Sequence, residues 1–187
     1  IDPQAVEVTK LSLALKMLEG ENSETINAQY KLFADRILPD LSSNIKCGNS
    51  LIGNDYYSDK QITLLGDEEL RKVNAFDWDK EFPLVFRYGG FDAVIGNPPW
   101  ISLTGKFGND ILSNDELQYL IVKYQGNTYM PNIYEYFVNK GLSLIKKGGI
   151  FSFIVPDRLG FNSQFNNLRK VILESFQINE LLYKAPF

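Results

Sequence analysis

The chain has 187 residues, 44% of them hydrophobic and 22% charged, which is typical of one globular domain. It contains no histidine, which excludes a Ser-His-Asp triad, a Cys-His pair and the common zinc sites, and we expect no metal centre. A single cysteine, Cys47, provides no disulfide framework and suits a cytoplasmic setting. No apolar run approaches the roughly 18–20 residues of a membrane span, and the formal net charge of -4 disfavours a free-standing DNA-binding protein.

The N-terminal part predicts few regular elements. Apolar residues recur at helical spacing from Ala5 to Leu18, and Asp2 is placed to cap that helix. A short strand is expected at Ile45–Cys47, ending in the glycine turn at Gly48. Residues 55–80 are rich in tyrosine and acidic residues and only weakly periodic, so we interpret them as an insertion with one short helix over 67–73.

The central segment is Phe91 to Trp100. Ala93, Val94 and Ile95 form a continuous apolar run, which predicts a short parallel strand covered on both faces. Pro98 and Pro99 remove two backbone donors, so the strand must stop at Asn97. Asn97 and Trp100 are therefore expected at the carboxyl edge of a sheet, where open α/β sheets bind their ligands.

Helix and strand signals alternate in the C-terminal half. After a mobile loop over 101–114, helices are expected over 115–124, 132–145 and 163–176, with strands over 150–155 and 178–183. This alternation predicts a three-layer α/β fold with a mostly parallel sheet.

The turn Asn97-Pro98-Pro99-Trp100 resembles the catalytic signature of amino-methylating DNA methyltransferases. The side-chain oxygen of Asn97 and the carbonyl of Pro98 can accept the two hydrogens of an exocyclic amine, whose lone pair then faces a methyl donor. Proline presets φ, so its carbonyl is oriented at little entropic cost. Trp100 can stack on a base rotated out of the duplex. The structural alternative is a strand-ending turn with a core tryptophan.

Several further segments, in order, resemble the gamma-class N6-adenine DNA methyltransferases, most closely the methylase domains of type IIG, Eco57I-like restriction-modification enzymes. The resemblance implies a Rossmann-like fold that uses S-adenosylmethionine. Cys47 to Leu51 is similar to the segment that contacts the adenine of the cofactor, which makes Asn49 and Ser50 candidate cofactor-binding residues, although Asn49 equally suits a strand-ending turn. Asp2 lies beside the position of the ribose-binding acid, which is itself missing, and it suits a helix cap better than a cofactor contact.

The resemblance also suggests residues that surround the target base. Phe187 matches the family position of a second aromatic, which would hold the adenine against Trp100. Asn132 to Tyr134 and Pro156 to Arg158 match segments that line the site, although both equally suit structural roles.

Two parts of the family pattern are absent. No Phe-x-Gly-x-Gly loop occurs, although the family places it after the first strand, before Ile1. The target-recognition domain is expected beyond Phe187, and double-stranded DNA would be gripped mainly through such missing parts. We therefore interpret residues 1–187 as a partial catalytic domain that is inactive in isolation.

The predicted function is site-specific adenine methylation of DNA in a restriction-modification system. The same turn also occurs in cytosine-amino, RNA and protein-glutamine methyltransferases, so adenine rests on the family resemblance. An alternative is a degenerate methylase-like module used for DNA docking or as a scaffold. An unrelated nucleotide-binding α/β protein would leave the turn unexplained. The sequence does not indicate the oligomeric state.

Overall fold

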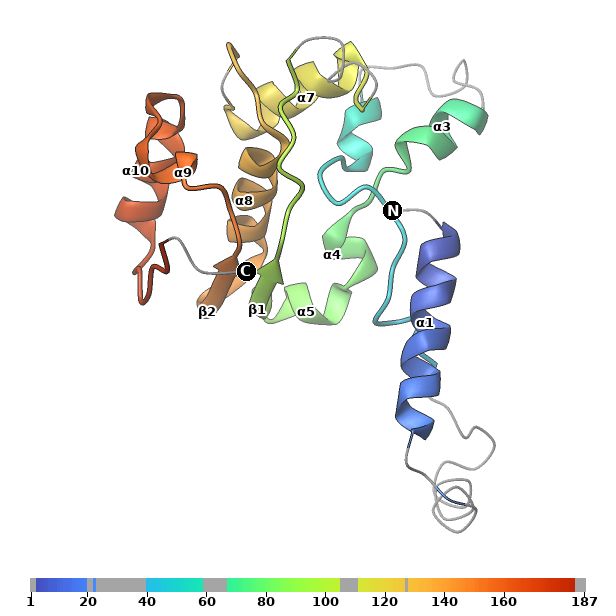
Figure 1. Cartoon of the computed structure of the whole chain (residues 1–187). Coiled ribbons are helices and arrows are strands. Elements are labelled where there is room, and N and C mark those ends of the chain that lie inside the picture. The colour runs from blue at the N-terminus through green and yellow to red at the C-terminus, as the bar shows by residue number, and fades with distance from the viewer. Residues whose placement is uncertain are drawn as a thin grey trace. The chain divides into compact units, whose positions relative to one another are not determined.

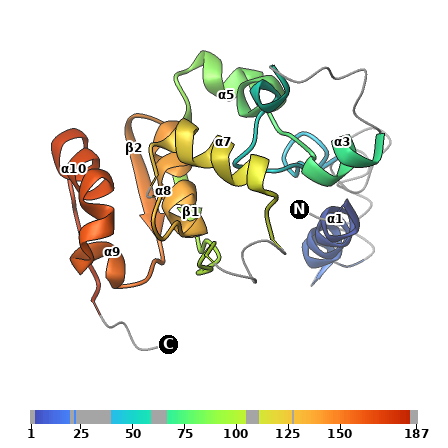
Figure 2. The same ribbon diagram turned by 90° about the horizontal axis from the view of Figure 1, so that it is seen from above.

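The structure is a computed structural model that describes residues 3–19, 22, 40–58, 67–104, 111–126 and 128–183. The chain divides into two compact units, Ile1–Phe82 and Pro83–Phe187. Figure 1 and, from above, Figure 2 show the elements of each unit. Among the described residues, no helix combines the length and apolar character needed to cross a membrane.

The described residues of the first unit form four short or medium helices. They are α1 (Pro3–Leu18), the 3-10 helix η1 (Asn54–Tyr57), α3 (Asp67–Val73) and α4 (Trp78–Glu81). The predicted helices over 5–18 and 67–73 are thus confirmed. The core of this unit gathers buried apolar residues around the turn that precedes η1, namely Leu51, Ile52, Tyr56, Tyr57, Val73 and Phe76.

The prediction of a strand at residues 45–47 is wrong. Pairing occurs two residues later, where Asn49 forms an isolated parallel bridge with Ala75. The Asn49 side-chain oxygen then accepts hydrogen bonds from the backbone of Leu51 (3.1 Å) and Ile52 (3.3 Å), which turns the chain and ends the ladder. A Cβ on Gly48 would lie 2.3 Å from the Phe76 ring, so the bridge needs glycine there.

The second unit is a mixed α/β arrangement. Its elements in order are α5 (Pro83–Arg87), β1 (Phe91–Gly96), α7 (Asn114–Tyr124), α8 (Ile133–Leu144), β2 (Ile145–Phe153), α9 (Arg158–Phe161), η3 (Ser163–Phe165) and α10 (Asn166–Ser175). The predicted helices over 115–124, 132–145 and 163–176 are confirmed to within a few residues. A capping box between Ser113 and Glu116 begins α7.

The two strands β1 and β2 pair in parallel, which confirms the α/β class. Their register joins Ala93 to Ile150 and Gly96 to Phe153, with an irregularity at the start of the ladder. That irregularity contains Gly148 at φ 79°, in the left-handed region that glycine tolerates. Lys146 to Gly149 therefore belong to β2, so this strand begins earlier than the predicted strand over 150–155.

Helix α8 packs against one face of this sheet (Figure 1). Phe151 and Phe153 stack with ring centroids 4.3 Å apart. A Cβ on Gly141 would approach the Phe151 ring to 2.6 Å, so the glycine lets α8 lie close to the strand. The prediction that the central strand is covered on both faces is wrong, because Ile95 is 82% exposed and Ile150, the ladder partner of Ala93, is 61% exposed.

The predicted closing strand over 178–183 is also wrong. These residues lie within the described part of the chain and run without regular secondary structure. Tyr183 instead packs edge-on against Phe161, with ring centroids 5.7 Å apart. Apolar content alone does not make a strand when the backbone has no neighbouring strand to pair with.

Candidate active site

The Asn97–Trp100 turn directly follows β1, as predicted. The ladder ends with the backbone of Ile154 donating to the carbonyl of Gly96 (3.0 Å). Beyond that bond Pro98 is buried, whereas Asn97 and Pro99 are exposed. The buried ring of Pro98 holds the turn in place, and the Asn97 side chain remains accessible at the carboxyl edge of the sheet.

Trp100 is joined to the neighbouring strand through its indole. The Nε1–H group donates to the carbonyl oxygen of Ile154 at 3.4 Å, and the side chain is 51% exposed. One edge of the indole is thus bound to the end of β2 while half of its surface stays accessible. The alternative of a core tryptophan does not fit this exposure.

The residues after the turn form a strap against the start of α8. Leu103 donates to the carbonyl of Pro131 (2.8 Å), and Ile133 donates to the carbonyl of Ile101 (3.1 Å). Ser102 and Asn132 lie opposite each other in an antiparallel bridge. This part of the predicted mobile loop is therefore paired, while residues 105–110 lie outside the described part of the chain.

Tyr134 lies in the first turn of α8 and contacts the segment that follows β2. It is buried and packs against Phe165, with ring centroids 5.4 Å apart. Burial and the Glu135 charge raise the pKa of Tyr134 to about 12, and the charges of Arg158 and Asp157 shift it in opposite directions. The hydroxyl stays protonated at neutral pH, so Tyr134 can donate a hydrogen bond but is no general base.

Three segments thus converge at one edge of the second unit. They are the turn with its strap (97–103), the start of α8 (132–134) and the segment after β2 (154–165). The predicted lining segments, Asn132–Tyr134 and Pro156–Arg158, both belong to this edge. The indole bond and the strap have no local sequence signal, so neither could be predicted from the sequence.

The predicted cofactor residues Asn49 and Ser50 belong to the first unit. The Asn49 side-chain oxygen is engaged in its own turn, and the carbonyl of Ser50 accepts a hydrogen bond from the Trp78 indole at 3.0 Å. These bonds fix both residues at the end of the bridge with Ala75. Asp2 and Phe187 lie outside the described residues.

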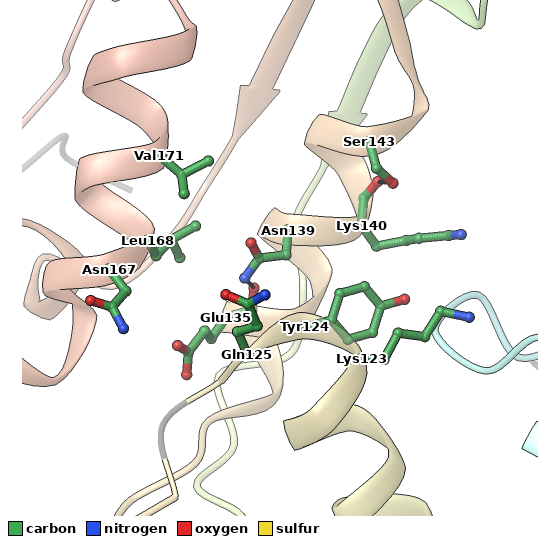
Figure 3. Close-up of a pocket in the computed structure, with 10 residues that line it drawn as sticks. All are labelled: Lys123, Tyr124, Gln125, Glu135, Asn139, Lys140, Ser143, Asn167, Leu168 and Val171. Atoms are coloured by element: carbon green, nitrogen blue, oxygen red, sulfur yellow. Dashed lines mark hydrogen bonds between the residues drawn. The ribbon is translucent and has the colours of Figure 1, made fainter.

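A pocket of about 420 Å³ lies elsewhere in the second unit, between the end of α7, α8 and α10 (Figure 3). Its lining mixes charged and apolar side chains, among them Lys123, Glu135, Asn139 and Leu168. None of the Asn97–Trp100 residues lines it. Within the described ranges, no group of three or more Cys, Asp or Glu residues is arranged to hold a metal ion.

Comparison with known proteins identifies the family. The model of the Eco57I restriction-modification methylase family matches residues 1–185. This chain belongs to that family. The match covers the Asn97–Trp100 turn and the segments that converge on it.

Individual relatives agree with the family assignment. The type II restriction enzyme and methyltransferase RM.Eco57I of Escherichia coli is 29% identical over 181 residues, which is 97% of this chain and 16% of that protein. The putative type II restriction enzyme and methyltransferase RM.MjaORFECS2P of Methanocaldococcus jannaschii is 28% identical over 120 residues, 64% of this chain and 9% of that protein.

The modification methylase CviBIII of Paramecium bursaria Chlorella virus NC1A is 25% identical over 115 residues, 62% of this chain and 27% of that protein. The chain thus spans between about a tenth and about a quarter of the length of these relatives. No solved structure matches the chain.

Proposed function

We propose that this chain is the catalytic part of a site-specific DNA adenine methyltransferase of a restriction-modification system. One observation carries the proposal: an accessible Asn97 follows a parallel strand, with a buried Pro98 and a half-exposed Trp100 in the same turn. Membership of the Eco57I restriction-modification methylase family supports it. The CviBIII relative is named a modification methylase, which agrees with a methyl-transfer activity.

The proposal includes a Rossmann-like fold for the intact catalytic domain, with residues 1–187 as part of it and 55–80 as an insertion. The parallel pair of β1 and β2 with α8 on one face supports this assignment. The open face around Ile95 agrees with a three-layer domain in which further elements cover this face.

The residues around Asn49 fit the adenine end of S-adenosylmethionine. Because the Asn49 oxygen is held by the backbone of Leu51 and Ile52, the plane of its amide is fixed. Its Nδ2 group is then the part that would donate to a ring nitrogen of the cofactor. We assign Asn49 and Ser50 to this contact, with Asp2 as a further candidate. S-adenosylmethionine, when bound, supplies an electrophilic methyl group.

In the proposed reaction the protein orients the nucleophile. The Asn97 side-chain oxygen and the Pro98 carbonyl accept the two hydrogens of the adenine amine, which directs the nitrogen lone pair away from the turn. Pro99 continues the rigid backbone, so the two acceptors are held in place before the base arrives. The amine is not protonated at neutral pH, so its lone pair needs no base to free it. When the N–CH3 bond forms and the S–CH3 bond breaks, the nitrogen becomes cationic and acidic, and it releases one proton to solvent without a strong base. This role suits a turn in which Pro98 is buried and Asn97 is accessible.

Trp100 provides the stacking surface for the flipped base in this proposal, and Phe187 is the candidate for the opposite face. Aromatic stacking recognises a base by its π-face and contributes about 1–3 kcal/mol per base. The bond from the indole to Ile154 supports the role of Trp100, because it limits rotation of the ring. Double-stranded DNA is the proposed partner and the cytoplasm the proposed location.

The test is methyl transfer from labelled S-adenosylmethionine to unmethylated DNA by the intact protein. After transfer, the DNA is digested to nucleosides and the labelled nucleoside is identified. We expect the label on N6-methyladenine. Label on cytosine would move the assignment to a cytosine-amino methyltransferase. An absence of label from a protein that folds and binds DNA would favour a docking module.

A further inference from the structure

Arg169 on α10 makes three hydrogen bonds, two of them to the segment that follows β2. Its Nη1 group donates to the carbonyl oxygens of Leu159 (2.8 Å) and Asn162 (2.7 Å). Its Nη2 group donates to the side-chain oxygen of Asn166. One guanidinium thus joins α10 to Leu159 in α9 and to Asn162 after it, while the bond to Asn166 lies within α10 itself.

The two backbone acceptors lie in and just after a short helix. Helix α9 has only four residues, so its last carbonyl groups, that of Leu159 among them, have no partners further along the same helix. The carbonyl oxygen of Asn162 also accepts a hydrogen bond from the backbone of Phe165 (3.2 Å). The planar guanidinium presents several N–H groups in fixed directions, whereas a lysine ammonium is a single point charge on a flexible stem. Arginine can therefore hold Leu159, Asn162 and Asn166 at once, which lysine cannot do in the same geometry.

The segment held by Arg169 is attached to the candidate active site at its other end. The carbonyl oxygen of Ile154 accepts the hydrogen bond from the Trp100 indole. Phe165, which is fully buried, packs against Tyr134. Between these two attachments the chain makes its own local bonds, for example from Gly160 to Asp157 (2.8 Å) and from Asn162 to Arg158 (2.9 Å). The exposed residues of this stretch, including Asp157, Arg158 and Phe161, extend from that held backbone.

We propose that Arg169 is a positioning residue that fixes residues 156–165 as one wall of the site for the flipped base. The inference rests on the proposed function. It assigns Arg169 no contact with the base and no part in moving protons. Arg169 acts through the backbone of Leu159 and Asn162, so that the wall is ordered before DNA binds. Without it, each binding event would have to order the wall.

The experiment compares the intact wild-type protein with Arg169→Ala, Arg169→Lys and the control Lys170→Ala. Lys170 is the next residue on α10 and, among the residues that the structure describes, forms an ion pair with Glu174 at 3.9 Å, with both side chains exposed. The control therefore removes one positive charge from α10 and keeps the hydrogen bonds from Arg169 to Leu159 and Asn162. Two quantities are measured, namely amide hydrogen exchange and kcat/KM for methylation of unmethylated DNA.

Hydrogen exchange tests the positioning role without requiring activity. The informative amides are those of Leu159, Gly160, Asn162, Gln164 and Phe165, each of which donates a hydrogen bond within the segment. We expect Arg169→Ala to raise their exchange rates at least tenfold and to leave the β1 amides unchanged. Unchanged exchange in the segment would overturn the proposal. Faster exchange throughout the second unit would also overturn it, because Arg169 would then hold the fold and not the wall.

Activity tests the consequence for the reaction. We expect kcat/KM to fall at least tenfold in Arg169→Ala, to fall in Arg169→Lys as well, and to stay within twofold in Lys170→Ala. Added guanidinium ion at low millimolar concentration should restore part of the activity of Arg169→Ala, while the same concentration of potassium chloride should not. Wild-type kcat/KM in Arg169→Ala would overturn the proposal. A wild-type protein without methyl transfer would instead refute the proposed function, and exchange would still decide whether Arg169 holds the segment.

Discussion

The Trp100 indole and the Ile154 carbonyl, 54 residues apart in the chain, are joined by a hydrogen bond of 3.4 Å. The bond connects the turn after β1 to the end of β2, next to the last backbone bond between the two strands. It holds one edge of the indole and leaves half of the side chain exposed. The ring is thus oriented by the sheet that also positions Asn97.

Two substitutions at Trp100 distinguish the contribution of its aromatic face from the contribution of its indole hydrogen bond. Trp100→Phe keeps an aromatic face and loses the indole donor, whose long, half-exposed bond contributes little, so kcat/KM should stay within about threefold of wild type. Trp100→Ala removes the face as well, and kcat/KM should fall roughly five- to 150-fold. The measurement is kcat/KM of methyl transfer to DNA for the two variants and the wild type. Equal losses in the two variants would show that the hydrogen bond, and not stacking, is the main contribution.

Gly90 is expected to tolerate no side chain. It has φ 124°, and a Cβ there would lie 2.5 Å from the carbonyl oxygen of Leu144 and 3.0 Å from the backbone nitrogen of Lys146. Gly90→Ala should destabilise the protein by roughly 2–4 kcal/mol, through the left-handed backbone and the clash. Gly160→Ala is the matched control, because nothing lies within 4 Å of its Cβ position. In urea unfolding, the free energy of unfolding should fall strongly in Gly90→Ala and hardly at all in Gly160→Ala.

Asp77 should make the first unit sensitive to acid. Hydrogen bonds from the Lys80 ammonium (2.7 Å) and from the backbone of Asn54 (2.9 Å) hold the pKa of Asp77 at about 2. Because this pKa lies below the ordinary 3.8, the ionised form stabilises the folded state above about pH 4. That contribution is lost as the pH falls from about 4 to about 2.

The measurement for Asp77 is urea unfolding at pH 5 and pH 2.5. Wild type should lose more stability over this interval than Asp77→Asn, which has no carboxylate to protonate there. The control is Asp79→Asn. Asp79 is an exposed residue of α4, the helix that Asp77 precedes, and this variant should behave like wild type. If Asp77→Asn kept the wild-type pH dependence of stability, the acid sensitivity would not come from Asp77.

Predictions from local patterns were largely confirmed. The helices of the C-terminal half follow from apolar spacing and from start signals such as Ser113 before Glu116. The end of β1 follows from Pro98 and Pro99, which no ladder accommodates. These features depend on residues close together in the chain, so the sequence displays them directly.

Features that depend on distant segments were missed. An apolar run such as Ala93 to Ile95 looks the same whether its second face is covered or open, and here Ile95 is exposed. The strap of Ile101 and Leu103 pairs with residues about 30 positions later, without a motif at either end. Nothing in the sequence around Arg169 indicates that its guanidinium reaches the carbonyls of Leu159 and Asn162.

The central claim is that Asn97 orients the amine that receives the methyl group. The most direct test is methyl transfer from labelled S-adenosylmethionine to DNA by the intact wild-type protein, Asn97→Ala and Asn167→Ala. Asn167 is an exposed asparagine on α10 and serves as the matched control.

We expect Asn97→Ala to lower kcat by about 100- to 1,000-fold, the loss typical when one preorganised hydrogen-bonding group is removed from an active site, with unchanged thermal stability. Asn167→Ala should retain wild-type activity. Wild-type activity in a folded Asn97→Ala protein would contradict the proposed mechanism.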